Sequence, residues 1–328
     1  MNRLINSPHF RTFSLGLKMI LLGFIAWFLY RQIFLYHDVL SLSAYYVKLM
    51  ARPDTIPLLC LVFSMMFINW FLESIKWRLL ISTLESVSMG KALMAVFTGV
   101  AFSIFTPNRI GEFGGRIFLL EKADRVSAAL VTILGSMSQL LITLLFGGIA
   151  LIYYFMDSYL VPNSILYPTL ILTPIALFAL LYFYFRVDVL QKLMNVFAFT
   201  RKHAHHTEVL AHFSRKQLAA ALGLSALRYI TFTSQYLILL HIAAVDTSIF
   251  EATLMIVLTY LMLAIPALAF VELGSRILVA QEMLGSLSDN HLGIFTATSA
   301  LYLINVALPA LIGSFFILRL KFFRSNDV

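Results

Sequence analysis

Uncharged, mostly apolar intervals divide this chain into lengths that suit membrane-spanning helices. The longest contain no Asp, Glu, Lys or Arg and lie between Asp54 and Glu73, Arg125 and Asp157, Asp157 and Arg186, Glu251 and Glu272, and Asp289 and Arg319. Shorter ones run from Lys18 to Arg31, Lys91 to Arg109 and Arg228 to Asp246. A spanning helix needs about 20 predominantly apolar residues. Because these runs are continuous rather than alternating, we predict helices and not a β-barrel.

The composition supports the same fold class. Hydrophobic residues make up 60% of the 328 positions and charged residues 12%, against roughly 45–50% and about 25% in soluble domains. So few charged side chains could not cover the surface of a soluble protein. We therefore predict an all-α, polytopic integral membrane bundle that forms a single membrane domain over residues 1–328. The net charge of +8 is not expected to indicate a nucleic-acid partner.

The placement of basic residues predicts the orientation, because Lys and Arg concentrate in cytoplasmic loops. Basic residues gather before the first apolar stretch, in the segment 186–216 and after residue 318. The N-terminal apolar stretch continues without a convincing cleavage site, so we expect a first spanning helix and not a signal peptide. Both termini are predicted in the cytoplasm, and a basic cytoplasmic linker, 188–216, joins a first half, about 1–187, to a second half, 217–328.

This orientation leaves two apolar stretches that cannot cross the membrane. The helix near 56–80 ends in the cytoplasm and the helix near 127–156 starts there, so the stretch between them must enter and return. The helix near 217–241 ends outside and the last helix, near 291–318, starts outside. Each intervening stretch is interrupted by a proline, Pro107 in the first and Pro266 in the second. We predict two broken, re-entrant hairpins over 91–122 and 250–284, one from each face.

The two hairpins also share a sequence. Glu112-Phe113-Gly114-Gly115-Arg116-Ile117 matches Glu272-Leu273-Gly274-Ser275-Arg276-Ile277, and the two glutamates lie 160 residues apart. The matching segments occupy equivalent places in the predicted topology. We therefore predict an inverted-topology repeat.

Transporters with inverted repeats place their sites at the membrane midplane, where broken helices present their ends. The prolines stop each preceding helix, and Gly111, Gly114, Gly115 and Gly274 allow close approach of backbone or substrate. Helix restarts point free amide groups at the site. Forked guanidinium donors suited to phosphate come from Arg109, Arg116 and Arg276. This cavity would bind an anionic headgroup.

Other charged residues have alternative interpretations. Glu112 and Glu272 either pair with the arginine four residues later, carry a proton or bind a cation, or contact substrate. Arg228 lies about three turns into its helix and is a candidate for substrate binding. Asn69, Trp70, Glu73, Trp77 and Arg78 are interpreted as anchors at the cytoplasmic end of a helix, with headgroup contact as the alternative for Arg78.

Several kinds of chemistry have no sequence support. The chain has no P-loop, GxSxG, HExxH or paired CxxC motif, each of which marks a specific site. We expect no catalytic residue, no metal site and no cofactor, and the protein is not expected to be an enzyme.

Three segments carry a family resemblance: Pro107-Asn108-Arg109-Ile110-Gly111-Glu112, Glu272-Leu273-Gly274, and the helix end from Asn69-Trp70 to Trp77-Arg78. In these segments the chain resembles the lysylphosphatidylglycerol synthase transmembrane-region family, the flippase-like membrane domain of the multiple peptide resistance factor. The resemblance covers nearly the whole chain. It implies a stand-alone member without the soluble synthase domain, so lysyl-lipid synthesis is not expected.

The resemblance also implies a location and partners. It places the chain in a bacterial or archaeal cytoplasmic membrane, with lipids as its ligands. A homo-oligomer and a separately encoded lipid-modifying enzyme are the partners considered. The preferred function is translocation of an anionic lipid or lipid-linked headgroup. The alternatives are a proton- or sodium-coupled transporter of a small solute and a membrane-embedded transferase acting on a lipid carrier.

Overall fold

The computed structural model describes residues 39–104, 106, 110–157, 161–187, 204–265 and 272–317. Throughout these ranges the regular structure is helical, with no strand. In chain order the helices are α3 (Val39–Met50), α4 (Thr55–Ile81), α5 (Met89–Ser103), α6 (Gly111–Ile117), α7 (Arg125–Asp157), α8 (Asn163–Phe185), α11 (Ala204–Ala211), α12 (Arg215–Ile242), α13 (Ile249–Leu263), α14 (Glu272–Gly285), α15 (His291–Tyr302), the π-helix η3 (Leu303–Ala307) and α16 (Leu308–Ile317).

The predicted polytopic helical bundle is confirmed in this part of the chain. Four helices are long and apolar enough to cross a membrane: α4, α7, α8 and the continuous helical segment His291–Ile317. The predicted helix near 217–241 corresponds to α12, which is just as long but carries Arg228 and Gln235 in its interior. The predicted N-terminal helix, most of the linker 188–216 and both termini lie outside the described residues.

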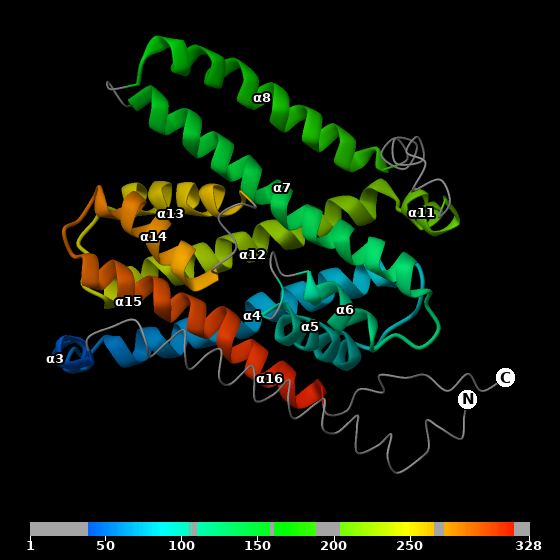
Figure 1. The fold of residues 1–328 in the computed structure, drawn as a ribbon, viewed down its shortest axis with the longest axis horizontal. Coiled ribbons are helices and arrows are strands. Elements are labelled where there is room, and N and C mark those ends of the chain that lie inside the picture. The colour runs from blue at the N-terminus through cyan, green and yellow to red at the C-terminus, as the bar shows by residue number, and fades with distance from the viewer. Residues whose placement is uncertain are drawn as a thin grey trace.

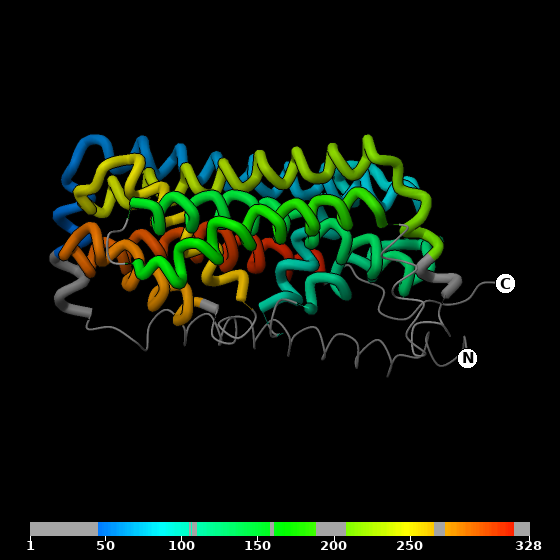
Figure 2. Tube along the Cα trace, turned by 90° about the horizontal axis from the view of Figure 1, so that it is seen from above, coloured from blue at the N-terminus to red at the C-terminus, as the bar shows by residue number. Residues whose placement is uncertain are grey.

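The long helices lie roughly along one axis, and the short helices lie between them (Figure 1). α4 packs along α12, and both views place these two helices next to each other (Figures 1 and 2). α5 packs against α6 and α16, while α13 packs against α14 and α7. The α5–α6 pair lies toward one end of the long helices, and the α13–α14 pair lies toward the other (Figure 1).

The two short apolar helices begin in the same way. The hydroxyl of Ser88 accepts a hydrogen bond from the Lys91 backbone N–H at the start of α5. Ser248 does the same for Glu251 at the start of α13. A serine N-cap satisfies one of the free amide groups of the first turn, so the sequence fixes where each helix starts.

Small residues bring the short helices into close contact with their neighbours. Gly313 of α16 lies against the Phe97 carbonyl of α5, closer than any side chain would permit. In α7, a Cβ at Gly147 would lie 2.8 Å from Leu261 of α13. Small residues let helix backbones approach in membranes, where van der Waals packing drives association. Glycine therefore permits the close contacts of α16 with α5 and of α7 with α13.

Gly313→Ala should destabilise the protein, because its new methyl group would overlap the α5 backbone. Overpacking typically costs about 1–3 kcal/mol, so the thermal midpoint in detergent should fall. Gly223→Ala in α12 is the matched control, since a Cβ there meets nothing within 4 Å. Equal midpoints for the two variants would contradict the close contact of α16 with α5.

Glu85 anchors the segment after α6 to the loop that follows α4. Its carboxylate accepts hydrogen bonds from the backbone N–H groups of Glu121, Lys122 and Ala123, at 3.0, 2.7 and 3.0 Å. Burial raises the pKa of Glu85, but these hydrogen bonds, with the charge of Lys91, outweigh it and lower the pKa overall. Ionised Glu85 therefore stabilises the folded chain.

This stabilisation should depend on pH in the acid range. Because the pKa of Glu85 is lower in the folded chain, its contribution is present above the ordinary value of 4.5 and is lost as the pH falls through the folded value. Glu85→Gln should lower the thermal midpoint at pH 7, and the gap from wild type should shrink below pH 4.5. A gap that is constant with pH would refute this role.

Candidate functional site

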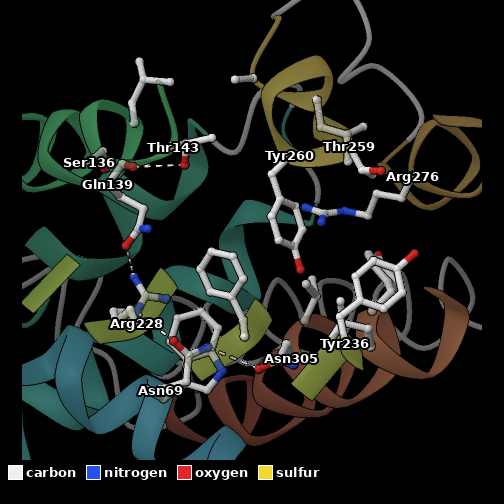
Figure 3. Close-up of a pocket in the computed structure, with 18 of the residues that line it drawn as sticks. Asn69, Ser136, Gln139, Thr143, Arg228, Tyr236, Thr259, Tyr260, Arg276 and Asn305 are labelled. Atoms are coloured by element: carbon white, nitrogen blue, oxygen red, sulfur yellow. Dashed lines mark hydrogen bonds between the residues drawn. The ribbon is translucent and has the colours of Figure 1, made fainter. Parts of the chain in front are cut away.

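A cavity of about 450 Å³ lies in the middle of the bundle. Its walls come from α4, α6, α7, α12, α13, α14, α15 and η3, so both short-helix pairs contribute (Figure 3). The polar and charged residues that line it are Asn69, Glu112, Ser136, Gln139, Thr143, Arg228, Tyr236, Thr259, Tyr260, Arg276, Thr298, Tyr302 and Asn305. We call this space the central cavity.

Beside the central cavity, one buried carboxylate binds three cations. Glu73 of α4 is only 4% exposed. Its Oε1 accepts from Arg116 Nη1 of α6 at 2.8 Å, and its Oε2 pairs with Lys76 Nζ at 2.8 Å and with Arg228 Nη1 of α12. An ion buried in a membrane protein is costly unless it is paired and hydrogen-bonded. Glu73 thus joins α4, α6 and α12 through charge pairs, and we call it and its three cations the Glu73 cluster.

The Glu73 cluster continues to both sides. Lys76 is 1% exposed and also donates to the Ser225 hydroxyl of α12 at 3.3 Å. Arg116 binds the Glu112 carboxylate one turn earlier in α6. The Glu112–Arg116 ion pair, one of the alternatives for Glu112, is therefore present in the structure. It places Glu112 at the cavity wall, while the guanidinium of Arg116 lies behind it.

A chain of amide side chains extends from Arg228. The guanidinium Nε donates to Asn69 Oδ1 at 2.9 Å, and Asn69 donates to Asn305 Oδ1 at 3.2 Å. Asn305 donates to Gln235 Oε1 at 3.1 Å, and Gln235 donates to the Val62 carbonyl at 2.9 Å. This network links α4, α12 and η3 around one side of the central cavity.

The π-helix explains how Asn305 reaches this network. Pro309 lies four residues after Asn305 and has no backbone N–H, so the usual helical hydrogen bond to the Asn305 carbonyl cannot form. The backbone instead forms the wider π-helix η3 over Leu303–Ala307. Such single-turn π segments re-aim side chains and occur frequently at functional sites. Here η3 turns Asn305 and Val306 toward the central cavity.

Three polar atoms of the lining have no hydrogen-bond partner among the described residues. They are the indole Nε1 of Trp70, the amide Nε2 of Gln139 and the hydroxyl of Tyr260. Trp70 is only 3% exposed. The Cζ atom of Arg228 lies over its ring, 5.3 Å from the ring centroid. Buried polar groups are nearly always hydrogen-bonded, so these three atoms are exceptions within the described part of the chain.

The structure brings some of the predicted site residues together at the cavity. Glu112, Arg228 and Arg276 line it, and Figure 3 shows Arg228 and Arg276 on opposite sides. Arg116 is not a lining residue, but it pairs with Glu112 at the cavity wall and with Glu73 behind it. Arg78 does not belong to the lining: it is exposed near the end of α4 and donates to the Val87 carbonyl at 3.0 Å.

The predicted glycines differ in their surroundings. A Cβ at Gly115 would lie 2.7 Å from Gly99 of α5, and at Gly111 it would overlap the Phe102 carbonyl. These two residues therefore permit the close contact of α5 with α6, whereas Gly114 faces open space. Gly274 lies in the first turn of α14.

Other predictions fall outside the description. Pro107, Arg109 and Pro266 are not among the described residues, nor is the side chain of Glu272. Among the described residues, no group of three or more His, Cys, Asp or Glu side chains is placed to hold a metal ion.

One interpretation from the sequence is wrong. Asn69, Trp70, Glu73 and Trp77 are not interfacial anchors, because each is at most 4% exposed. The sequence contained a signal for this: Asn69, Glu73 and Lys76 recur at helical spacing on one face. Three polar residues on one face of an apolar helix indicate a buried network.

The chain matches a known family of membrane domains. The family model described as "Lysylphosphatidylglycerol synthase TM region" matches residues 15–313. No curated protein and no solved structure matches the chain. The predicted resemblance is therefore confirmed over nearly the whole length.

Glu73→Gln should strongly destabilise the fold, because Lys76, Arg116 and Arg228 would remain buried without their shared anion. Removing one partner of a buried pair costs about 3–5 kcal/mol. The double variant Glu73→Gln/Lys76→Gln removes one cation as well and should recover part of the loss of thermal midpoint in detergent. A double variant no more stable than the single one would contradict charge balance as the cause.

Proposed function

Since the chain belongs to the lysylphosphatidylglycerol synthase TM region family, we propose that it translocates an anionic lipid or lipid-linked headgroup across the membrane. The headgroup binds in the central cavity, and the acyl or prenyl chains remain in lipid. The family description connects the matched region with a lipid-modifying system.

One observation carries this proposal: two arginines approach the central cavity from opposite sides. Arg228 and Arg276 both line it (Figure 3), and guanidinium groups are well suited to phosphate oxygens. Charged residues in the body of a membrane bundle are costly and mark substrate pathways by default. We propose that the phosphate of the headgroup binds between the two side chains and interacts with both.

The inverted repeat is part of the proposal, and the helix boundaries support it. α4 and α12 begin at Thr55 and Arg215, and α5 and α13 begin at Met89 and Ile249, each pair 160 residues apart. The packing is reciprocal as well: α5 lies against α16 and α13 against α7. The α5–α6 pair thus contacts α16 of the second half, and the α13–α14 pair contacts α7 of the first half, as expected for two interlocked repeats.

We expect alternating access from this arrangement. The α5–α6 pair lies toward one end of the long helices and the α13–α14 pair toward the other, and both contribute lining residues. Rocking of one repeat against the other around a fixed site is the usual motion of inverted-repeat transporters. We expect each pair to enter the membrane and return to the same face.

The pairing of Glu112 favours translocation over ion-coupled transport of a small solute. Its carboxylate binds Arg116, and this pairing favours a structural ion pair over a free proton carrier. The proposal includes a bacterial or archaeal cytoplasmic membrane with cytoplasmic termini, no catalysis by the chain itself, and a separate enzyme that modifies the lipid.

Arg276→Gln should slow lipid movement on the order of tenfold, because a charged hydrogen bond to phosphate is lost. The measurement is dithionite quenching of fluorescent phosphatidylglycerol in reconstituted vesicles. Arg125→Gln is the matched control, since Arg125 is exposed at the start of α7 and outside the cavity lining. The proposal fails if both variants move lipid at the wild-type rate.

A further inference from the structure

We propose that the protein has a second lipid site, separate from the central cavity, where an anionic phospholipid of the surrounding membrane binds between α8 and α12. The site is a groove of about 390 Å³, and we call it the α8–α12 groove. Its lining residues are Phe178, Leu181, Tyr182, Phe185, Arg186 and Arg215. None of them lines the central cavity, so this inference does not depend on the proposed translocation.

The α8–α12 groove lies where a peripheral helix meets the rest of the bundle. α8 packs along α7 and also touches α12, and Tyr184 is its only buried residue. The Tyr184 hydroxyl lies 2.7 Å from the Ser138 hydroxyl of α7 and donates to the Leu218 carbonyl of α12 at 3.1 Å. These bonds bring the C-terminal end of α8 to the first turns of α12 (Figure 1).

One face of α8 forms the apolar part of the groove. Phe178, Leu181, Tyr182 and Phe185 recur at intervals of three and four residues, so they lie on the same side of the helix. The side chains of Phe178 and Tyr182 are 72% and 48% exposed. Phe178 precedes Arg186 by eight residues, or about 12 Å along the helix axis. This face can therefore pack against the upper part of an acyl chain.

Two arginines form the charged end of the groove. Arg186 is the C-cap of α8, and Arg215 is the first residue of α12. The 23 residues of α8 extend about 35 Å, slightly more than the hydrocarbon core of about 30 Å, so these arginines lie at the level of the lipid headgroups. The Cζ atom of Arg186 lies over the Tyr182 ring, 6.0 Å from its centroid, which keeps the guanidinium beside the groove. Its forked donors suit phosphate oxygens.

The charge of this region selects an anionic lipid. From Arg186 to Lys216 the sequence has six Lys or Arg residues and two Asp or Glu residues, and the proposed orientation puts this end of α8 at the cytoplasmic face. Basic pockets between helices on that face bind anionic headgroups, whereas the two arginines repel the choline of a zwitterionic lipid. The phosphate binds between Arg186 and Arg215 with a chain against Phe178 and Tyr182, and the lipid thereby connects α8 to α12.

The test is lipid retention by the purified full chain, measured by native mass spectrometry with dioleoyl phosphatidylglycerol and dioleoyl phosphatidylcholine as probes. All proteins carry Arg276→Gln, which weakens the proposed binding in the central cavity, so retained lipid reports the groove. Adding Arg186→Gln/Arg215→Gln should reduce phosphatidylglycerol retention about tenfold, because charged hydrogen bonds to phosphate are lost. Lys216→Gln is the matched control, since Lys216 is exposed beside Arg215 and outside the groove lining. It should leave retention unchanged.

A second measurement tests the connection between the helices. A ligand that binds the folded protein raises its thermal midpoint, so phosphatidylglycerol should raise the midpoint in detergent more than phosphatidylcholine does. Arg186→Gln/Arg215→Gln should abolish this difference, and Arg186→Lys/Arg215→Lys, which keeps both charges, should retain most of it. Lipid movement in reconstituted vesicles should stay at the wild-type rate in both double variants.

The possible failures are distinguishable. Unchanged phosphatidylglycerol retention in Arg186→Gln/Arg215→Gln would overturn the second site, and so would equal retention of the two lipids by the parent protein. A loss in Lys216→Gln as large as in the double variant would mean diffuse surface attraction and would also overturn it. A changed oligomeric state with unchanged lipid retention would assign the groove to a second copy of the chain. Wild-type lipid movement in Arg276→Gln, by contrast, would count against the proposed translocation and leave the groove standing.

Discussion

The arrangement of the site depends on one buried carboxylate, Glu73, and the three cations bound to it. A charge held inside a membrane bundle is tolerated only with close partners. Arg116 comes from α6 and Arg228 from α12, so the pairing fixes a short helix and a long helix against α4. Lys76 lies on the same helix as Glu73 and adds a further link to α12 through the Ser225 hydroxyl. The Glu73 cluster thus sets the positions of the elements that form the cavity.

The same interaction orients the groups that face the substrate. Arg228 is held from behind by Glu73 and Asn69, so its guanidinium is positioned before any ligand arrives. Glu112 is likewise held by Arg116. The amide chain through Asn305 and Gln235 extends this order into η3 and α12. A preorganised site loses little free energy to ordering when it binds. The proposed lipid phosphate would therefore meet donors that are already in place.

Much of the fold could be predicted from the sequence, because uncharged runs fix helix lengths. The predicted helix near 56–80 is α4, Thr55–Ile81, and the one near 127–156 is α7, Arg125–Asp157. Candidate site residues were predicted where charge interrupts an apolar run, as at Arg228 and Glu112. Both line the cavity.

The rest required three-dimensional contacts. Glu73 was misassigned because a charged residue near a helix end usually reaches the interface, and only its partners on α6 and α12 show that it is buried. The π-helix at Asn305 was not predicted, since Pro309 in an apolar run is compatible with several local geometries. The role of Gly313 depends on which helix lies opposite it, and no spacing in the sequence specifies that.

The central claim is that one anionic headgroup is bound between Arg228 and Arg276. An experimental structure of the protein in nanodiscs of phosphatidylglycerol would test it most directly. The account predicts lipid density in the central cavity, with the phosphate within hydrogen-bonding distance of both guanidinium groups. A central cavity without lipid density, while lipids are resolved on the outer surface of the same particles, would contradict it.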